Sequence, residues 1–180
     1  MITTRSPSGF ELHKKGVYSV KFQVMSRANA RRHSFRSVMD DCVIVSISDV
    51  TSEPNRFHNN PHIKGVCHLS FDDVEGNEAN CMTRADAEKI IDFVNSHVDK
   101  VDEIIVHCFA GISRSAGVCA ALMLILTGDD MEIFNNPRFC PNMHCYRTVL
   151  ETYFGSYNKE AADEKIKHNI ALWRQAQGLD

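Results

Sequence analysis

A cysteine and an arginine lie six positions apart in this chain. They bracket a short loop within His107–Ser115, which reads HCFAGISRS. A cysteine thiolate is a strong nucleophile, and the planar guanidinium of Arg114 can bind two oxygens of one anion. The apolar run Ile104–Val106 precedes the loop, and the longer apolar run Ala116–Leu126 follows it. The spacing therefore predicts a nucleophile and an oxyanion receptor within one loop.

The elements on either side of this loop explain how it could bind an anion. A strand, a tight loop and a helix start together form a cradle of backbone N–H groups. Those groups and Arg114 favour the charged thiolate form of Cys108. Gly111 permits the tight turn that the loop needs. The same positive field that favours the thiolate would bind a phosphate dianion.

The hydrophobic pattern predicts strands that alternate with helices. Strands are expected at Val17–Val24, Cys42–Ile47, Val66–Phe71 and Glu103–His107. Helices are expected at residues 26–32, 83–98, 114–126, 130–134, 143–157 and 159–177. This alternation indicates an α/β fold with a central, mostly parallel sheet of four to five strands and helices on both faces.

A parallel sheet would bring acidic residues to the predicted loop. The loops that follow the carboxyl ends of parallel strands gather at one edge of the sheet. Asp72 and Asp73 follow one predicted strand, so we expect them near Cys108. Asp49 follows another strand, and two interpretations remain for it: a place at this edge of the sheet, or a role in a turn only.

Length and net charge limit which domain organisation and which partners are expected. The 180 residues, with a net charge of −3 and a pI of about 6.3, predict a single domain over 1–180. Its core is expected at about 17–157, with an irregular arm at 1–16 and a C-terminal helix at 158–180 that either packs on the core or binds a partner. The acidic balance speaks against a nucleic-acid partner. One basic cluster is a solvated helix face or a docking patch for an acidic substrate; it contains Arg27, Arg31, Arg32 and Arg36.

Cysteine usage and hydropathy bear on the compartment and on cofactors. Seven cysteines without a Cys-x-x-Cys pair, and a first segment without an apolar signal region, predict reduced thiols and a cytoplasmic protein. The longest apolar run is shorter than a membrane span, so no membrane partner is expected. No metal or other cofactor is expected, because the only His/Cys cluster lacks a ligand spacing typical of zinc; it comprises His58, His62, Cys67 and His68.

The Cys-x5-Arg loop resembles the signature of the cysteine-dependent protein tyrosine phosphatase superfamily, and it is closest to the dual-specificity branch. The positions that agree with the signature are His107, Cys108, Ala110, Gly111, Ser113, Arg114 and Ser115. Leu69–Asp73 looks like the segment that bears the family's general acid, and Pro141-Asn142 also resembles a family element. The resemblance covers about residues 40–155 and implies a protein tyrosine phosphatase-like fold.

The resemblance implies a role for each residue of the site. Cys108 attacks phosphorus and forms a cysteinyl phosphate, and Asp73 is the general acid, with Asp72 as the alternative. Ser115 donates a hydrogen bond to the departing sulfur, while His107 supports the cysteine through hydrogen bonds. The phosphate-binding positions are Phe109, Ala110, Gly111, Ile112, Ser113 and Arg114.

These expectations describe a phosphomonoester hydrolase, and the expected class is a protein tyrosine or dual-specificity phosphatase. Phosphorylated proteins or peptides are the expected substrates, and the oligomeric state is open. An RNA 5′-phosphatase of the same superfamily is one alternative, with only the basic cluster in its favour. A non-catalytic phosphate-binding module is another. Cys42 and Cys67 are candidate resolving thiols if Cys108 is oxidised.

Overall fold

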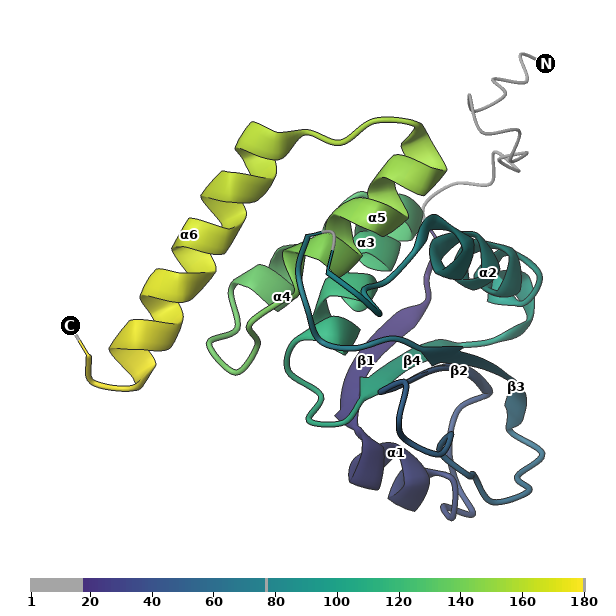
Figure 1. Ribbon diagram of the computed structural model, residues 1–180. Coiled ribbons are helices and arrows are strands. Elements are labelled where there is room, and N and C mark those ends of the chain that lie inside the picture. Colours follow the sequence, from purple (N-terminus) through teal and green to yellow (C-terminus); the bar gives the residue numbers. More distant parts are fainter. Residues whose placement is uncertain (1–17, 77, 180) are drawn as a thin grey trace.

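A four-stranded parallel sheet in the order β1-β4-β2-β3 forms the centre of the molecule (Figure 1). The computed structural model describes residues 18–76 and 78–179, so the predicted arm at 1–16 lies outside the described residues. The strands are β1 Lys21–Ser26, β2 Cys42–Ser48, β3 Ile63–Ser70 and β4 Glu103–Cys108. The prediction of a parallel α/β sheet with four to five strands is confirmed.

Among the described residues, six α-helices accompany the sheet. They are α1 Arg27–His33, α2 Arg84–Asn95, α3 Arg114–Thr127, α4 Met131–Phe134, α5 Met143–Phe154 and α6 Lys159–Ala176, with a short 3₁₀ turn at Val98–Lys100. Local sequence sets several ends. Ser26 caps α1, Thr83 and Asp86 form a reciprocal capping box on α2, and Gly128 ends α3 in the left-handed conformation.

Two predicted strands begin at different residues in the structure. The first strand begins at Lys21, after residues 18–20, because its ladder with β4 starts where β4 itself starts, at Glu103; the predicted start at Val17 lies outside the described residues. The third begins at Ile63 rather than Val66, because Ile63 pairs with Cys42, the first residue of β2. Pairing with a neighbour, which local propensity does not encode, decided both boundaries.

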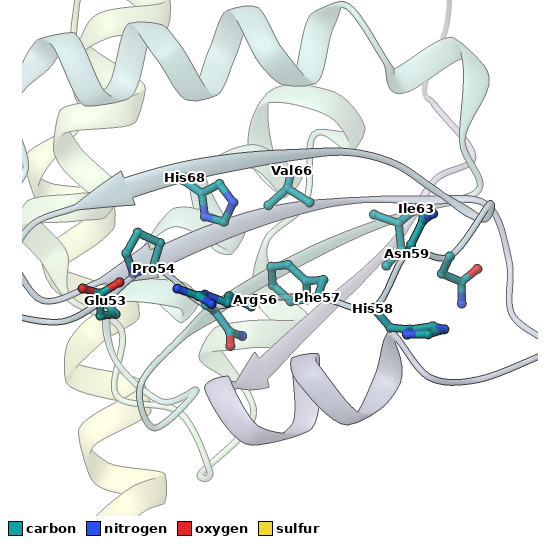
Figure 2. A pocket seen from close by; sticks show the side chains of 11 residues that line it. Glu53, Pro54, Arg56, Phe57, His58, Asn59, Ile63, Val66 and His68 are labelled. Atoms are coloured by element: carbon teal, nitrogen blue, oxygen red, sulfur yellow. The ribbon is translucent and has the colours of Figure 1, made fainter.

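The sheet divides the apolar residues between its two faces, as the alternation of side chains along a strand requires. On the smaller face, Ile44 and Ile105 pack with Ala30 of α1. Phe57 joins this cluster from the segment that runs beside α1 (Figure 2). Helix α1 and the 53–59 segment therefore cover this face together.

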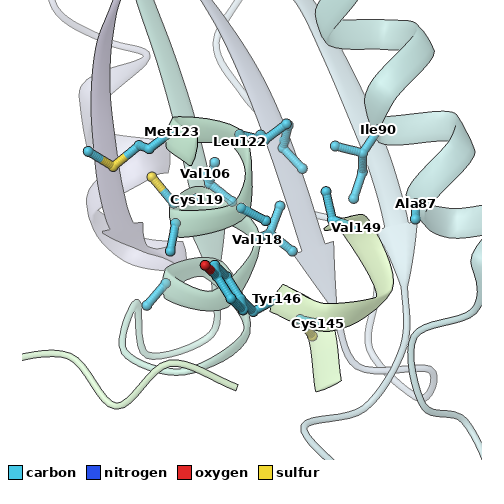
Figure 3. Packing of buried hydrophobic residues seen from close by; sticks show 14 of the residues in the cluster. Ala87, Ile90, Val106, Val118, Cys119, Leu122, Met123, Cys145, Tyr146 and Val149 are labelled. Atoms are coloured by element: carbon cyan, nitrogen blue, oxygen red, sulfur yellow. The ribbon is translucent and has the colours of Figure 1, made fainter. Parts of the chain in front are cut away.

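The larger core lies on the opposite face, where α3 packs against the sheet with α2 and α5 beside it (Figure 1). Val106 of β4, Val118 and Leu122 of α3, and Val149 of α5 meet in this core (Figure 3). Helix α3 is buried along most of its length, as its continuous apolar sequence predicts. Helices on both faces are thus confirmed.

Polar contacts attach α6 to the domain. Lys165 pairs with the buried Asp130 at 2.7 Å, and Tyr146 donates a hydrogen bond to the same carboxylate at 2.6 Å. Asn169 is fully buried and donates to the carbonyl of Phe134. The C-terminal helix therefore packs on the core. Across the described residues, no helix has both the length and the apolarity that crossing a membrane requires.

Candidate active site

The predicted loop lies at the carboxyl edge of the sheet, between the last residue of β4, Cys108, and the first residue of α3, Arg114. Gly111 has a φ of +72° in this loop. A β-carbon at this position would lie 2.5 Å from the backbone of Met25 and Ser26. Both the positive φ and the close approach of β1 exclude other side chains here, which supports the expectation for Gly111.

The backbone amides of the loop are free to bind an anion. Gly111 N–H donates to Cys108 Sγ at 3.3 Å. Within the described part of the chain, the other amides of the loop donate to no protein acceptor; they belong to Phe109, Ala110, Ile112, Ser113 and Arg114. The amino end of the 14-residue helix α3 adds its positive dipole end at the same place. The loop is therefore an oxyanion receptor built from main chain.

Cys108 lies at the base of this receptor and is 2 % exposed. Its sulfur is 3.1 Å from Ser115 Oγ, in addition to the Gly111 contact. Other cysteines lack such donors, and burial raises the pKa of the Cys42 thiol to about 12 and also raises that of Cys119. Among these thiols, Cys108 is the one surrounded by groups that stabilise a negative sulfur.

Arg114 is held along one edge and open along the other. Its Nη1 donates to the carbonyl of Phe71 at 2.7 Å and lies 2.8 Å from Asp49 Oδ1. Its Nε is buried and has no partner among the described residues. An unpaired buried donor is costly, so this edge of the guanidinium suits an anion that binds two donors at once.

Asp73, rather than Asp72, contacts the loop. Asp73 Oδ1 accepts hydrogen bonds from Ser113 Oγ at 2.8 Å and from Asn142 Nδ2 at 2.9 Å. Asp72 instead accepts from the backbone of Val50, in the turn after β2, at 3.1 Å and from Asn80 at 3.2 Å, which ties its own segment to that turn. The structure therefore brings Asp73 to the loop and uses Asp72 to shape the turn.

His107 is fully buried behind the loop. Its Nδ1 lies 3.3 Å from the carbonyl oxygen of Cys108, and its Nε2 lies 2.9 Å from Ser46 Oγ. Burial lowers the pKa of His107 to about 4, so the ring is neutral near pH 7. A neutral ring donates from Nδ1 to the carbonyl and accepts from Ser46, which fits the expected supporting role.

This buried ring predicts an acid-dependent loss of stability. In the unfolded chain His107 has its ordinary pKa of 6.5, so below that pH the unfolded state binds the proton first and stability falls. We expect this residue to contribute a loss of about 3 kcal/mol between pH 6.5 and pH 4. Urea unfolding of wild type and His107→Asn across this range measures it. Parallel curves for the two proteins would contradict the prediction.

The sequence pointed to Asp49 and Asn142 without showing the contacts that they make, and it gave little signal for Ser46. Asp49 was expected either at this edge or in a turn, and it lies at the edge as the ion-pair partner of Arg114. Ser46 interrupts the apolar run of β2, which ends at Ser48. This isolated hydroxyl was the only sign in the sequence that Ser46 has a polar partner. Asn142 caps α5 through its Oδ1 while its Nδ2 holds Asp73, so one side chain joins a helix start to the acid.

The two candidate resolving thiols, Cys42 and Cys67, lie apart from Cys108. Cys42 is level with Glu103, at the opposite end of β4 from Cys108, and Cys67 is on β3, two strands away. None of the seven cysteines forms a disulfide. In the part of the chain that the structure describes, no three metal-ligating side chains gather as a metal site would require.

Comparison with known proteins identifies a family. Residues 27–154 match the family model described as "Dual specificity phosphatase, catalytic domain". Similar solved structures include human DUSP28, at 16% identity, 97% coverage of this chain, 99% of that chain and a TM-score of 0.46. The Yvh1 phosphatase domain from Chaetomium thermophilum shows 18% identity, coverages of 92% and 96%, and a TM-score of 0.38. No curated protein matches the sequence.

Proposed function

Because the chain belongs to the dual-specificity phosphatase family, we propose that it hydrolyses phosphomonoesters through a cysteinyl-phosphate intermediate. One observation carries this proposal: the same loop holds a thiol and an anion receptor. The thiol has two hydrogen-bond donors beside its sulfur, and the receptor has donors without a partner. The Cys108 sulfur, the loop amides and the unpaired Nε of Arg114 all belong to residues 108–114. Such donors stabilise the charge on the equatorial oxygens during phosphoryl transfer.

The first half of the reaction transfers the phosphoryl group to sulfur. The Cys108 thiolate attacks phosphorus, the ester P–O bond breaks, and protonated Asp73 gives its proton to the departing oxygen. Asp73 is exposed and bonded to Ser113 of the loop, which supports its access to that oxygen. Arg114 and the loop amides bind the three non-bridging oxygens throughout.

The second half releases phosphate. A water attacks phosphorus, the Asp73 carboxylate takes one of its protons, and the S–P bond breaks to regenerate the thiolate. Ser115 Oγ, 3.1 Å from the sulfur, donates a hydrogen bond to the leaving thiolate. No atom changes oxidation state in this step: water supplies the oxygen that bonds to phosphorus, and the proton it loses restores protonated Asp73.

The substrates proposed for this reaction are phosphorylated proteins or peptides in the cytoplasm. The free state of all seven cysteines agrees with a reducing compartment. Phe109 and Ile112 are exposed at the loop, 66 % and 40 % respectively, and offer apolar surface to a polypeptide substrate. The loop interior has no lysine or second arginine, which disfavours a multiply phosphorylated lipid headgroup.

Hydrolysis of p-nitrophenyl phosphate in the presence of a metal chelator tests the proposed function. Wild type is expected to release nitrophenol, and acid quenching during turnover should trap one phosphate per chain on Cys108. Mass spectrometry of the peptide that contains the loop locates the label. Absence of turnover and of label would contradict the proposal, as would turnover that the chelator abolishes.

Asp49 is predicted to position Arg114 by accepting its hydrogen bond rather than through its own charge. Asp49→Asn keeps an acceptor oxygen at Nη1, so we expect kcat/KM to stay within about 3-fold of wild type. Asp49→Ala removes the acceptor, and we expect a loss of roughly 10-fold or more, from a hydrogen bond to a charged group. Steady-state kinetics measure both variants. Equal losses for Asn and Ala would assign the effect to charge instead.

A further inference from the structure

We propose that the groove beside the loop is a second anion-binding subsite, which recognises an acidic or phosphorylated side chain next to the reacting residue of a polypeptide. This inference rests on the proposed function and names the sequence context that the enzyme would prefer. The groove has a volume of about 960 Å³ and lies between α1 and the 53–56 segment. Its walls carry the four arginines Arg27, Arg31, Arg32 and Arg56.

The charge of the groove is unbalanced. Glu53 is the only carboxylate among its lining residues, so the lining carries three more positive than negative charges. In residues 18–76 and 78–179, no carboxylate lies within ion-pair distance of any of these arginines. The whole chain has a net charge of −3, so this local excess opposes the overall balance. A groove lined with one sign of charge concentrates ligands of the opposite sign.

The walls of the groove are joined to each other and to the catalytic loop. Asn55 Nδ2 donates to the carbonyl of Arg27 at 3.2 Å, and Arg27 Nη2 donates to the carbonyl of Glu53 at 2.7 Å. Arg27 N–H donates to the carbonyl of Phe109, the residue after Cys108, at 3.1 Å. Figure 2 shows Glu53 and Arg56 on the segment that passes α1. The groove is therefore already formed and begins at the loop.

The dimensions fit a neighbouring side chain of an extended peptide. An α-helix rises about 1.5 Å per residue, so Arg27 and Arg31 are displaced by about 6 Å along α1. An extended chain advances about 3.3 Å per residue, so this span covers about two peptide residues. Phe109 and Phe35, 66 % and 61 % exposed, line the same groove and offer apolar contacts between the charges. With a phosphate on the loop, a nearby acidic side chain would reach these arginines.

Binding to the Cys108→Ser protein tests the subsite without requiring turnover. The probes are two fluorescent phosphopeptides, one with Glu on both sides of the phosphorylated residue and one with Gln at those positions. Fluorescence anisotropy at low salt should give roughly 10-fold tighter binding of the Glu peptide, from contacts that solvent partly screens. Adding Arg31→Gln and Arg56→Gln should bring the ratio of the two affinities close to one.

A matched pair of substitutions removes the same charge elsewhere. Arg84→Gln on α2 and Lys167→Gln on α6 should leave the ratio at its original value, because both are exposed outside the groove. An affinity ratio near one in the Cys108→Ser protein overturns the subsite. The subsite is also overturned if the control pair lowers the ratio as much as the groove pair does. The assignment to a polypeptide is overturned if a 5′-phosphorylated oligoribonucleotide binds more tightly than the Glu peptide and the Arg31→Gln and Arg56→Gln substitutions abolish that advantage.

Failure of the proposed function gives a different result. If wild type hydrolyses neither peptide while the affinity ratio depends on Arg31 and Arg56, the subsite stands and the phosphatase proposal falls. If wild type hydrolyses both peptides at equal kcat/KM and the affinities are equal, the phosphatase proposal stands and the subsite falls.

Discussion

Cys108→Ser is expected to lower the turnover of p-nitrophenyl phosphate by a factor on the order of 10⁴ or more, as removal of a catalytic nucleophile does in other enzymes. A serine hydroxyl is far less acidic than a thiol, so the loop cannot hold it as the anion that attacks phosphorus. The Gly111 amide and Ser115 hydroxyl that stabilise the sulfur would have only a neutral oxygen to contact. Initial-rate kinetics at pH 7 measure the loss.

The same variant should keep its affinity for inorganic phosphate, because the loop amides and Arg114 remain. Binding at or above wild-type strength would separate loss of the nucleophile from loss of the receptor. Cys81→Ser serves as the matched control, since Cys81 is half-buried outside the loop and should tolerate the change with full activity. A Cys108→Ser protein with more than a tenth of wild-type turnover would rule out cysteine as the nucleophile.

Asp73→Asn is expected to lower the hydrolysis of an alkyl phosphate by about 10²- to 10³-fold, and that of p-nitrophenyl phosphate by less than about 10-fold. An alkoxide is a poor leaving group and needs the proton, whereas nitrophenolate leaves without it. Asparagine retains the oxygen that accepts from Ser113 and Asn142, so the local geometry is kept while the proton is lost. The comparison of kcat for the two substrates is the measurement.

Asp72→Asn provides the control for this prediction. Asp72 accepts from Val50 after β2 and from Asn80 and, among the described residues, has no hydrogen bond to the loop, so its substitution should affect both substrates alike. A leaving-group dependence that appears in Asp72→Asn and is absent in Asp73→Asn would exchange the two roles. Near-wild-type rates for Asp73→Asn with both substrates would show that the general acid lies outside this segment.

Local patterns in the sequence were enough to predict most of the elements and the Cys-x5-Arg loop. Local signals such as the Ser26 cap, the Thr83 capping box and Gly128 act within a few residues, so they can be read without a fold. The spacing of Cys108 and Arg114 is also local, and the α/β pattern follows from alternating apolar runs. Strand boundaries were less predictable, because partner strands set them.

Which distant groups meet at the loop could be read only from the folded chain. Asp72 and Asp73 are adjacent in sequence and identical in type. What places Asp73 at the loop is its contacts with Asn142 and Ser113, up to 69 positions away. The ion pair of Arg114 with Asp49 and the contact of His107 with Ser46 likewise join β2 to β4, which are neighbours in the sheet but far apart in the sequence. Side-chain contacts across parallel strands depend on register and direction, which no local pattern encodes.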